Sequence, residues 1–504
     1  MPRRTIPEVV AHAAAAYADL EALADSEGVR WTFRELGEQV DRCAGALIAA
    51  GVRPRDRVAL WAPNGRRFVV AALGAVCAGA ILVPVSTRFK GEEAAWILDK
   101  SGAALLMVEN GFLGNDYLAM LAAAGAAPPV VRLDEGWDEF LASGFLTPRA
   151  TVRPEDPADM FFTSGTTGKP KGVLAAHGQD IRVFQAWSDG VGLRTGDRYL
   201  IVNPMTHTFG YKAGVLACLL RGATMVPMPV FDVEQVLTRI ETERITVLPG
   251  PPTLYASLLD RQAGHDLSSL RLAVTGAATV PVRLIERMRA ELFDEVVIAY
   301  GLTESCGTVT VGDPRAEPAL MARTVGTAIE GTEVIVADPV TGQPAEPGQS
   351  GEVRVRGYNV MLGYFEDPAA TAEAVDADGW LHTGDIGVLD ADGNLSITDR
   401  LKDMYISGGF NVYPAEVEQV ITRHPAVSEA AVVGVADPDG RLGEVGCAYI
   451  IVRPGVACVT EQDIIGFCRE RLAGYKVPRF ARFASSLPRN ASGKVLKYEL
   501  RATT

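Results

Sequence analysis

Ten consecutive residues carry the side chains best suited to holding a polyphosphate. The segment TSGTTGKPKG, Thr163 to Gly172, contains three glycines, four hydroxyl side chains and two lysines. Glycines let backbone N–H groups turn toward an anion, and the hydroxyl and ammonium groups add donors and positive charge. The segment is not a Walker A loop, because Pro170 stands where that loop has Ser or Thr after its lysine. On composition alone, a phosphate-binding loop and an ordinary flexible loop both stay open.

Three later strands are each followed by a glycine-bearing loop. Their apolar runs are separated by helical patterns such as Pro281–Leu292, which is typical of a mainly parallel sheet. Ligands on such sheets bind beyond the carboxyl ends of the strands. We therefore expect one site assembled from loops that are distant in the sequence. The predicted strands are Ile245–Leu248, Leu270–Thr275 and Val296–Ala299.

Charge and cysteine usage exclude several classes of protein. The net charge of −14 argues against nucleic acid or an anionic membrane as the main partner. Seven cysteines lie scattered without a CxxC pair, which indicates a reduced, cytoplasmic protein without structural zinc. The apolar run Phe68–Val85 reaches the length of a membrane span, but its Ala and Gly content favours a buried helix followed by a buried strand. We expect no membrane span and no secretory signal.

The hydrophobic pattern predicts an α/β protein with two domains. Helix and strand alternate at the start, as in the helix Phe33–Ala50 and the strand Arg57–Trp61. Short strands with turn signals between Gly351 and Arg400 indicate a β-rich subdomain. The last part, with a helix at Pro414–Arg423, reads as a small α+β domain. The expected domains are residues 1–400, with mostly parallel sheets, and residues 401–504.

Several separated motifs, in order, resemble those of the adenylate-forming superfamily, which includes acyl-CoA synthetases, coumarate-type CoA ligases, luciferases and peptide-synthetase adenylation domains. The resemblance extends from about Phe33 to Lys497 and is carried by the Thr163–Gly172 segment together with YGLTE (Tyr300–Glu304), GWLHTGDIG (Gly379–Gly387) and PRNASGKVLK (Pro488–Lys497). It implies a large N-terminal domain and a small mobile C-terminal domain. It also implies an ATP-dependent reaction in which a carboxylate forms an acyl-adenylate and the thiol of CoA then displaces AMP.

The resemblance assigns a nucleotide site. By this resemblance, Tyr300 is expected to stack on adenine, and Asp385 and Arg400 are expected to hold the ribose hydroxyls. Mg²⁺ prefers hard oxygen ligands, and the motif assigns it the hydroxyl of Thr166 and the carboxylate of Glu304. The remaining residues expected at ATP are Thr163, Ser164, Gly165, Thr167, Gly168, Lys171, Gly276, Ala277, Ala278, Gly301 and Thr303.

The C-terminal motifs supply the expected catalytic lysine and the CoA step. Lys494 would neutralise the charge that builds up between the carboxylate and the α-phosphate. Lys402 corresponds to the hinge about which the small domain rotates, although alone it reads as a surface lysine. Gly408, Gly409 and Phe410 resemble the segment that accepts CoA, although alone they read as a glycine-rich turn.

The acid is expected against the segment that follows the nucleotide loop. His207 corresponds to the residue that guards the acyl pocket, and a catalytic and a structural role both stay open for it. For Lys212 we favour a side chain that reaches solvent, while the alternative pairs its ammonium with a polar group of the acid. The expected pocket residues are His207, Gly210, Tyr211, Lys212, Thr275 and Gly301.

Longer stretches of the sequence narrow the range of acids expected as the substrate. NPMTHTFGYKAGVLACLLRGAT, GAATVPV and RLKDMYISGGFNVYPAEVEQV most resemble actinobacterial ligases of steroid degradation, which activate a bicyclic indane-dione propanoate. A medium-chain fatty or aryl acid is the alternative. An adenylating enzyme with an acceptor other than CoA and an inactive nucleotide-binding protein also stay open. The expected partners are the acid, ATP with Mg²⁺, and CoA, and a homodimer is an open alternative.

Overall fold

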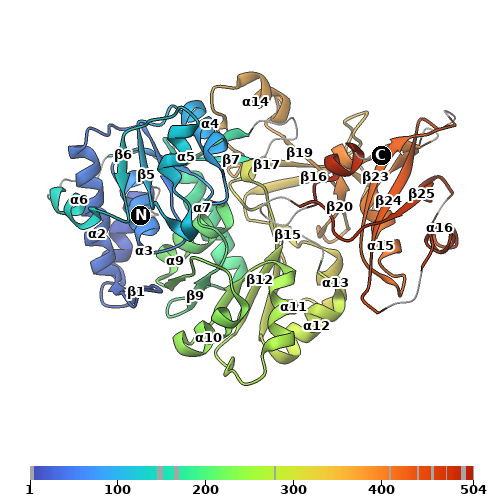
Figure 1. Cartoon of the computed structure of the whole chain (residues 1–504), viewed down its shortest axis with the longest axis horizontal. Coiled ribbons are helices and arrows are strands. Elements are labelled where there is room, and N and C mark those ends of the chain that lie inside the picture. The colour runs from blue at the N-terminus through green and yellow to red at the C-terminus, as the bar shows by residue number, and fades with distance from the viewer. Residues whose placement is uncertain are drawn as a thin grey trace. The chain divides into compact units, whose positions relative to one another are not determined.

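The computed structural model describes residues 5–144, 151–163, 170–276, 280–407, 410–439, 442–455, 459–472, 474–489 and 495–502, with only the backbone for Arg400, Lys402, Phe410 and Asn411. The chain forms two compact units (Figure 1). The first comprises Met1–Val334 and Val355–Leu381, and the second comprises Ile335–Arg354 and His382–Thr504. The segment 382–400 groups with the C-terminal residues, so these units do not divide at residue 400. The hinge boundary expected there stays a prediction.

The larger sheet of the first unit has nine strands with a parallel centre. Strands β13, β12, β11, β9, β10 and β1 run parallel, and antiparallel strands close both edges. The strand order is β15 (Thr327–Ala328), β14 (Thr310–Val311), β13 (Glu295–Tyr300), β12 (Leu272–Gly276), β11 (Val247–Pro249), β9 (Arg198–Ile201), β10 (Thr224–Pro227), β1 (Glu21–Ala24) and β2 (Arg30–Thr32). The three strands predicted with glycine loops lie in this parallel part of the sheet, as expected, and are neighbours.

The second sheet has seven strands and is also parallel over most of its width. Only β8 and β18 run antiparallel to their neighbours. The strand order is β18 (Gly363–Tyr364), β8 (Lys171–Ala176), β7 (Pro157–Thr163), β4 (Ile81–Pro84), β3 (Arg57–Trp61), β5 (Leu105–Val108) and β6 (Val130–Arg132). The strand predicted at Arg57–Trp61 is confirmed residue for residue.

Helices fill the space between the two sheets and cover their outer faces. One buried core contains apolar side chains of both sheets and of the helices between them: α1 (Ile6–Ala16), α2 (Phe33–Ala49), α3 (Arg66–Cys77), α6 (Trp137–Ser143), α7 (His177–Val191) and α9 (Ala217–Arg221). A second core joins the nine-stranded sheet to α10 (Val233–Glu243), α11 (Pro252–Arg261), α12 (Val282–Glu291) and α13 (Pro318–Arg323) (Figure 1). A third joins the seven-stranded sheet to α4 (Gly91–Ser101) and α5 (Tyr117–Ala123).

The long apolar run is a helix followed by a strand, as predicted. Helix α3 ends at Cys77, Gly79 adopts a positive φ of 83°, and β4 begins at Ile81. Every residue from Phe68 to Val85 is buried, which explains why the run is apolar on all sides. Within the described ranges, no helix is both long and apolar enough to cross a membrane.

The second unit contains smaller sheets and short helices. The chain enters it within β16 (Thr332–Ala337) and leaves it within β17 (Ser350–Gly357), and these strands form a sheet with β19 (Leu381–Leu389) and β20 (Leu395–Arg400). A hairpin of β21 (Tyr405–Ser407) and β22 (Phe410–Val412) follows. The remaining elements are α15 (Pro414–Ile421), β23 (Val427–Ala436), β24 (Glu444–Val452), α16 (Glu461–Arg469), β25 (Phe480–Phe483) and α17 (Lys497–Ala502). The small α+β arrangement expected here is confirmed.

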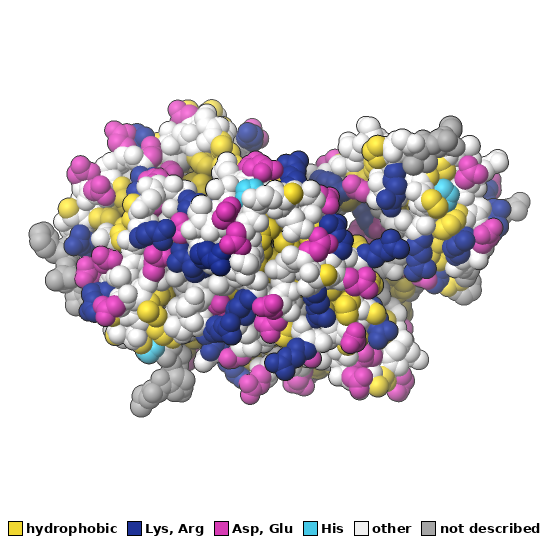
Figure 2. Space-filling view, turned by 90° about the horizontal axis from the view of Figure 1, so that it is seen from below, with side chains coloured by type: hydrophobic (Ala, Val, Ile, Leu, Met, Phe, Trp, Pro, Cys, Tyr) yellow, Lys and Arg dark blue, Asp and Glu magenta, His cyan; other side chains and the backbone are white. Residues whose placement is uncertain are grey.

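Charged side chains of both signs are interspersed over the face shown in Figure 2. The sequence has 62 acidic and 48 basic residues, which gives the net charge of −14. Six cysteines are described; all are buried, and none of the six forms a disulfide. No group of three or more His, Cys, Asp or Glu side chains within the described ranges could hold a metal ion.

Gly434 on β23 and Gly446 on β24 make room for the side chain of Tyr405. This packing predicts how substitution of a glycine would change the stability of the unit. A Cβ at Gly434 would lie 2.3 Å from Cβ of Tyr405. We expect Gly434→Ala to cost about 1–3 kcal/mol through overpacking. Amide hydrogen exchange of β23 and β24 should accelerate accordingly.

The matched control is Gly466→Ala in α16, because no atom lies within 4 Å of the position that the added methyl group would take. It should instead stabilise the unit by about 0.5–1 kcal/mol, since Gly is unfavourable inside a helix. Equal protection of β23 and β24 in both variants would contradict the packing argument.

Candidate active site

The predicted phosphate loop closes a β-hairpin. Strand β7 pairs antiparallel with β8, and Thr163 lies opposite Lys171 at the end where the loop begins. A Cβ at Gly172 would lie 2.8 Å from the sulfur of Met160, so a larger residue there would displace the Met160 side chain. The expected loop residues Ser164, Gly165, Thr166, Thr167 and Gly168 lie outside the described residues. The hairpin places both flanking residues, Thr163 and Lys171, at one edge of the sheet.

The loops after β12 and β13 start side by side. Gly276 pairs with Ala299 in the parallel ladder, so both strands end at the same edge, where Tyr300 and Gly301 follow. A Cβ at Gly276 would lie 2.3 Å from the carbonyl oxygen of Ala299, and one at Gly301 would lie 2.3 Å from that of Gly307. Only glycine allows these backbone approaches. Ala277 and Ala278 lie outside the described residues.

Glu304 lies just beyond this edge in the 3₁₀ turn η3 (Thr303–Ser305) and is half-buried. The hydroxyl of Tyr364 donates a hydrogen bond to its Oε1 at 3.0 Å. Nζ of Lys171 lies 4.8 Å from the centroid of the Tyr364 ring. Burial and the neighbouring Glu304 charge both raise the pKa of Tyr364, so the phenol stays protonated and donates. A carboxylate ordered in this way has the hard-oxygen chemistry that Mg²⁺ prefers, so it fits the expected ion.

His207 begins a short helical segment. Its Nδ1 accepts a hydrogen bond from the N–H of Phe209 at 3.2 Å, which caps α8 (Thr208–Gly210). The surrounding chain lowers the pKa of His207 by desolvation, although its side chain keeps an exposed face. A Cβ at Gly210 would lie 2.1 Å from the carbonyl oxygen of Pro204, so the turn needs glycine there. An exposed, neutral imidazole is therefore available to a ligand.

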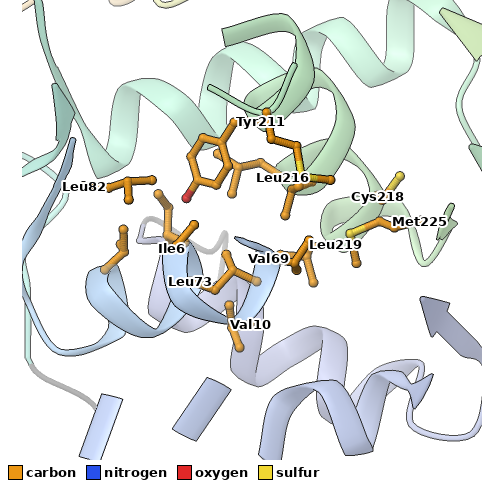
Figure 3. Close-up of a cluster of buried hydrophobic side chains, with 14 of the residues drawn as sticks. Ile6, Val10, Val69, Leu73, Leu82, Tyr211, Leu216, Cys218, Leu219 and Met225 are labelled. Carbon is orange, nitrogen blue, oxygen red and sulfur yellow. The ribbon is translucent and has the colours of Figure 1, made fainter. Parts of the chain in front are cut away.

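Tyr211 and Lys212 do not lie where we expected pocket residues. They begin a π-helical turn, η2 (Tyr211–Leu216), and are 0% and 1% exposed. Figure 3 shows Tyr211 pointing into the apolar cluster, with its hydroxyl end toward Ile6. The interpretation of Lys212 as a residue reaching solvent is wrong. Neither side chain has accessible surface for an acid in this structure.

The ammonium of Lys212 instead lies between two buried carboxylates. Nζ donates to Oδ1 of Asp180 at 2.6 Å and lies 3.0 Å from Oδ1 of Asp159. Burial lowers the pKa of Lys212, but the charges of Asp159 and Asp180 raise it by more. Burial and the Asp180 charge raise the pKa of Asp159 well above its usual value, against the effect of Lys212. We call these three residues the buried charge cluster, and infer that Asp159 is its protonated member.

Thr275 is the other expected pocket residue on β12. It is 0% exposed, and its hydroxyl has no hydrogen-bond partner within the described part of the chain. An unpaired buried hydroxyl is costly, so a buried water is its natural partner. Like Tyr211, Thr275 has no accessible surface for a ligand in this structure.

The second unit holds the remaining expected residues. Asp385 lies on β19, is 1% exposed, and stands opposite Arg400 of β20. Its N–H donates to Oγ1 of Thr383 at 3.0 Å. Lys402 lies in the 3₁₀ turn η4 (Leu401–Asp403), and Phe410 begins β22. Gly408, Gly409 and Lys494 lie outside the described residues, so their predicted roles are untested.

These features define the class of the protein. The chain belongs to the AMP-binding enzyme family: the family model matches residues 10–365, and the model of the family's C-terminal domain matches residues 416–494. It is an AMP-forming acyl-CoA ligase, and the adenylate-forming family expected from the motifs is confirmed.

Its relatives include enzymes named for one particular acid. The chain is 50% identical to a methyl-dioxo-octahydroindenyl propanoyl:CoA ligase of Rhodococcus jostii, over 99% of this chain and 98% of that protein. It is 51% identical, with the same coverage, to the ligase of that name from Mycobacterium tuberculosis. The crystal structure of ATP-bound MatB from Rhodopseudomonas palustris covers 99% of both chains with a TM-score of 0.88 at 29% identity.

The buried charge cluster gives a prediction that depends on which carboxylate is protonated. Asn resembles a neutral aspartic acid, so Asp159→Asn should change stability by less than about 1 kcal/mol. Asp180→Asn removes the charge that balances Lys212 and should cost about 3–5 kcal/mol. Unfolding by denaturant, with both variants beside the unsubstituted enzyme, measures the difference.

The protonation of Asp159 makes the stability of the folded state depend on pH in a definite direction. The pKa of Asp159 is higher in the folded than in the unfolded chain, where it is near 3.8. The folded state therefore binds more protons, and the contribution of Asp159 to stability falls as pH rises above about 4. This slope should be absent in Asp159→Asn. Equal losses in both Asn variants would contradict the assignment of the proton to Asp159.

Proposed function

We propose that this ligase activates a bicyclic indane-dione propanoate derived from steroid breakdown. The observation that carries the proposal is the identity of about half of all residues, along almost the whole chain, with two ligases named for that acid. The reaction would take place in the cytoplasm, and a homodimer stays a prediction. The reaction class itself follows from the family.

We infer that the edge of the two sheets in the first unit binds ATP. Thr163, Lys171 and the loop between them would hold the phosphates through N–H, hydroxyl and ammonium donors. Gly276, Gly301 and Thr303 would line the nucleotide site, and Tyr300 would stack on adenine. Glu304 with Thr166 would hold Mg²⁺, which when bound supplies positive charge to the phosphate oxygens.

We propose that residues of the second unit complete each half-reaction. Lys494 would stabilise the charge that develops as the carboxylate oxygen bonds to the α-phosphorus and pyrophosphate leaves. Asp385 and Arg400 would hold the ribose. Lys402 would act as the hinge for the second step, in which the CoA sulfur bonds to the acyl carbon and AMP leaves.

We propose a pocket for the acid beside the His207 turn. The exposed imidazole of His207 is the polar group that this segment supplies. The unpaired hydroxyl of Thr275 on β12 is fully buried and would join the pocket when neighbouring residues move aside for the acid. Gly210 and Gly301 would line the pocket with backbone alone, because neither position has room for a Cβ. A rigid bicyclic acid with ring carbonyls would find hydrogen-bond donors in such a pocket, whereas a linear fatty acid would not use them.

The substrate proposal predicts a ranking of acids. With ATP and Mg²⁺, pyrophosphate release should require CoA for sustained turnover and should be fastest with the bicyclic propanoate. Fatty acids of several lengths and aryl acids such as ferulate form the comparison panel. Faster turnover of a fatty or aryl acid would keep the ligase and overturn the steroid assignment. Turnover that does not require CoA would indicate a different acceptor.

The role of Lys494 predicts a loss confined to the first half-reaction. Lys494→Ala should slow acyl-adenylate formation by about 10²–10³-fold, as for removal of one fixed transition-state donor. Thioester formation from added acyl-adenylate and CoA should be nearly unchanged. Lys497→Ala, three residues away, is the control, because that side chain forms an ion pair with Glu418 at 2.8 Å. Equal slowing of both half-reactions would contradict the assigned role.

A further inference from the structure

One short segment joins the phosphate hairpin to the Glu304 turn. We call residues 359–365 the bridging segment. On one side its backbone is bound to β8: the N–H of Leu362 donates to Leu174 at 2.9 Å, and the N–H of Phe365 donates to Gly172 at 2.8 Å. Tyr364 stands opposite Val173 in the same antiparallel pairing. The segment is therefore fixed to the strand that leaves the phosphate loop.

On its other side the bridging segment is bound to the turn that carries Glu304. The N–H of Met361 donates to the carbonyl oxygen of Glu304 at 2.9 Å. The side-chain amide of Asn359, which is fully buried, donates to the carbonyl oxygen of Thr308 at 3.0 Å. These bonds fix the backbone of the turn but leave the long Glu304 side chain to be oriented separately.

Tyr364 provides that orientation through its side chain. Its hydroxyl donates to Oε1 of Glu304 at 3.0 Å, and its ring lies 4.8 Å from Nζ of Lys171. A hydrogen bond to a charged acceptor is among the stronger ones in proteins, and an ammonium over a phenol ring is attracted to the ring's negative face. One phenol thus contacts both a proposed metal ligand and a proposed phosphate ligand. No sequence motif marked this residue as part of the site.

We propose that Tyr364 is a positioning residue that holds the carboxylate of Glu304 ready for Mg²⁺ and the ammonium of Lys171 ready for the phosphates. This rests on the proposed role of Glu304 as a metal ligand. Without the phenol hydroxyl, the carboxylate of Glu304 samples several rotamers. Ordering it when Mg²⁺ binds then costs conformational entropy, which weakens the affinity for the metal. Partners that orient a metal ligand commonly change metal affinity by about 10–100-fold.

The test measures binding rather than turnover. The probe is α,β-methylene ATP, which cannot transfer its adenylyl group, and its affinity is determined by calorimetry over a range of Mg²⁺ concentrations. In Tyr364→Phe the ring and its contact with Lys171 remain, while the hydrogen bond to Glu304 is lost. We expect the Mg²⁺ concentration for half-maximal enhancement of binding to rise about tenfold, with little change in affinity when metal is chelated.

Tyr358→Phe is the matched control. Tyr358 immediately precedes the bridging segment, its ring lies 3.7 Å from the guanidinium carbon of Arg182, and its buried hydroxyl has no hydrogen-bond partner in the described part of the chain. Its Mg²⁺ dependence should equal that of the unsubstituted enzyme. In a Glu304→Gln background, Tyr364→Phe should produce no further change, because the carboxylate that Tyr364 orients has already been replaced by an amide.

Three outcomes would overturn the inference. The first is an unchanged Mg²⁺ dependence in Tyr364→Phe, which leaves the role of Glu304 intact. The second is an equal shift in Tyr358→Phe, which would show a general effect of the segment. The third is analogue binding to the unsubstituted enzyme that does not respond to Mg²⁺ at all. That result would also remove the metal role proposed for Glu304, whereas the acid panel would still test the ligase.

Discussion

A buried lysine between two buried carboxylates is the constraint on which the arrangement of the first unit depends. Asp159 lies on the strand that leads into the phosphate hairpin, Asp180 lies on α7, and Lys212 follows the His207 turn. Removing Asp180 or Lys212 from this cluster leaves an uncompensated buried charge, which costs several kcal/mol. Folding stabilities are of order 5–15 kcal/mol, so the cluster strongly restricts how these three elements can pack.

Much of the fold could be predicted, because its signals are local. A continuous apolar run identified β3, because a strand buried on both faces is apolar throughout. Helical periodicity ending at a glycine identified α2, because a helix buried on one face has apolar residues at regular spacing. The partners of Lys212 could not be predicted. Asp159 and Asp180 are separated from it by 53 and 32 residues in the numbering of the chain, and only the packing of three elements brings their charges together.

The residues of the candidate site also fall into those that the sequence could predict and those that it could not. Residues within motifs, such as Glu304, could be assigned because their spacing resembles that of a family. Tyr364 could not, because a tyrosine in a two-residue strand carries no local signal of its function. Its importance comes from strand pairing with β8, which is a long-range property. Sequence reasoning thus found the groups that touch ligands more readily than the groups that orient them.

The burial of the cysteines has a consequence for an enzyme whose co-substrate is itself a thiol. Thiol–disulfide exchange needs an accessible thiolate, and the six described cysteines are all buried. Desolvation raises the pKa of Cys468 to about 11 and also raises that of Cys447. Oxidised CoA therefore finds no reactive sulfur among them with which to form a mixed disulfide. None of these six described cysteines therefore offers oxidised CoA a site at which to trap the enzyme.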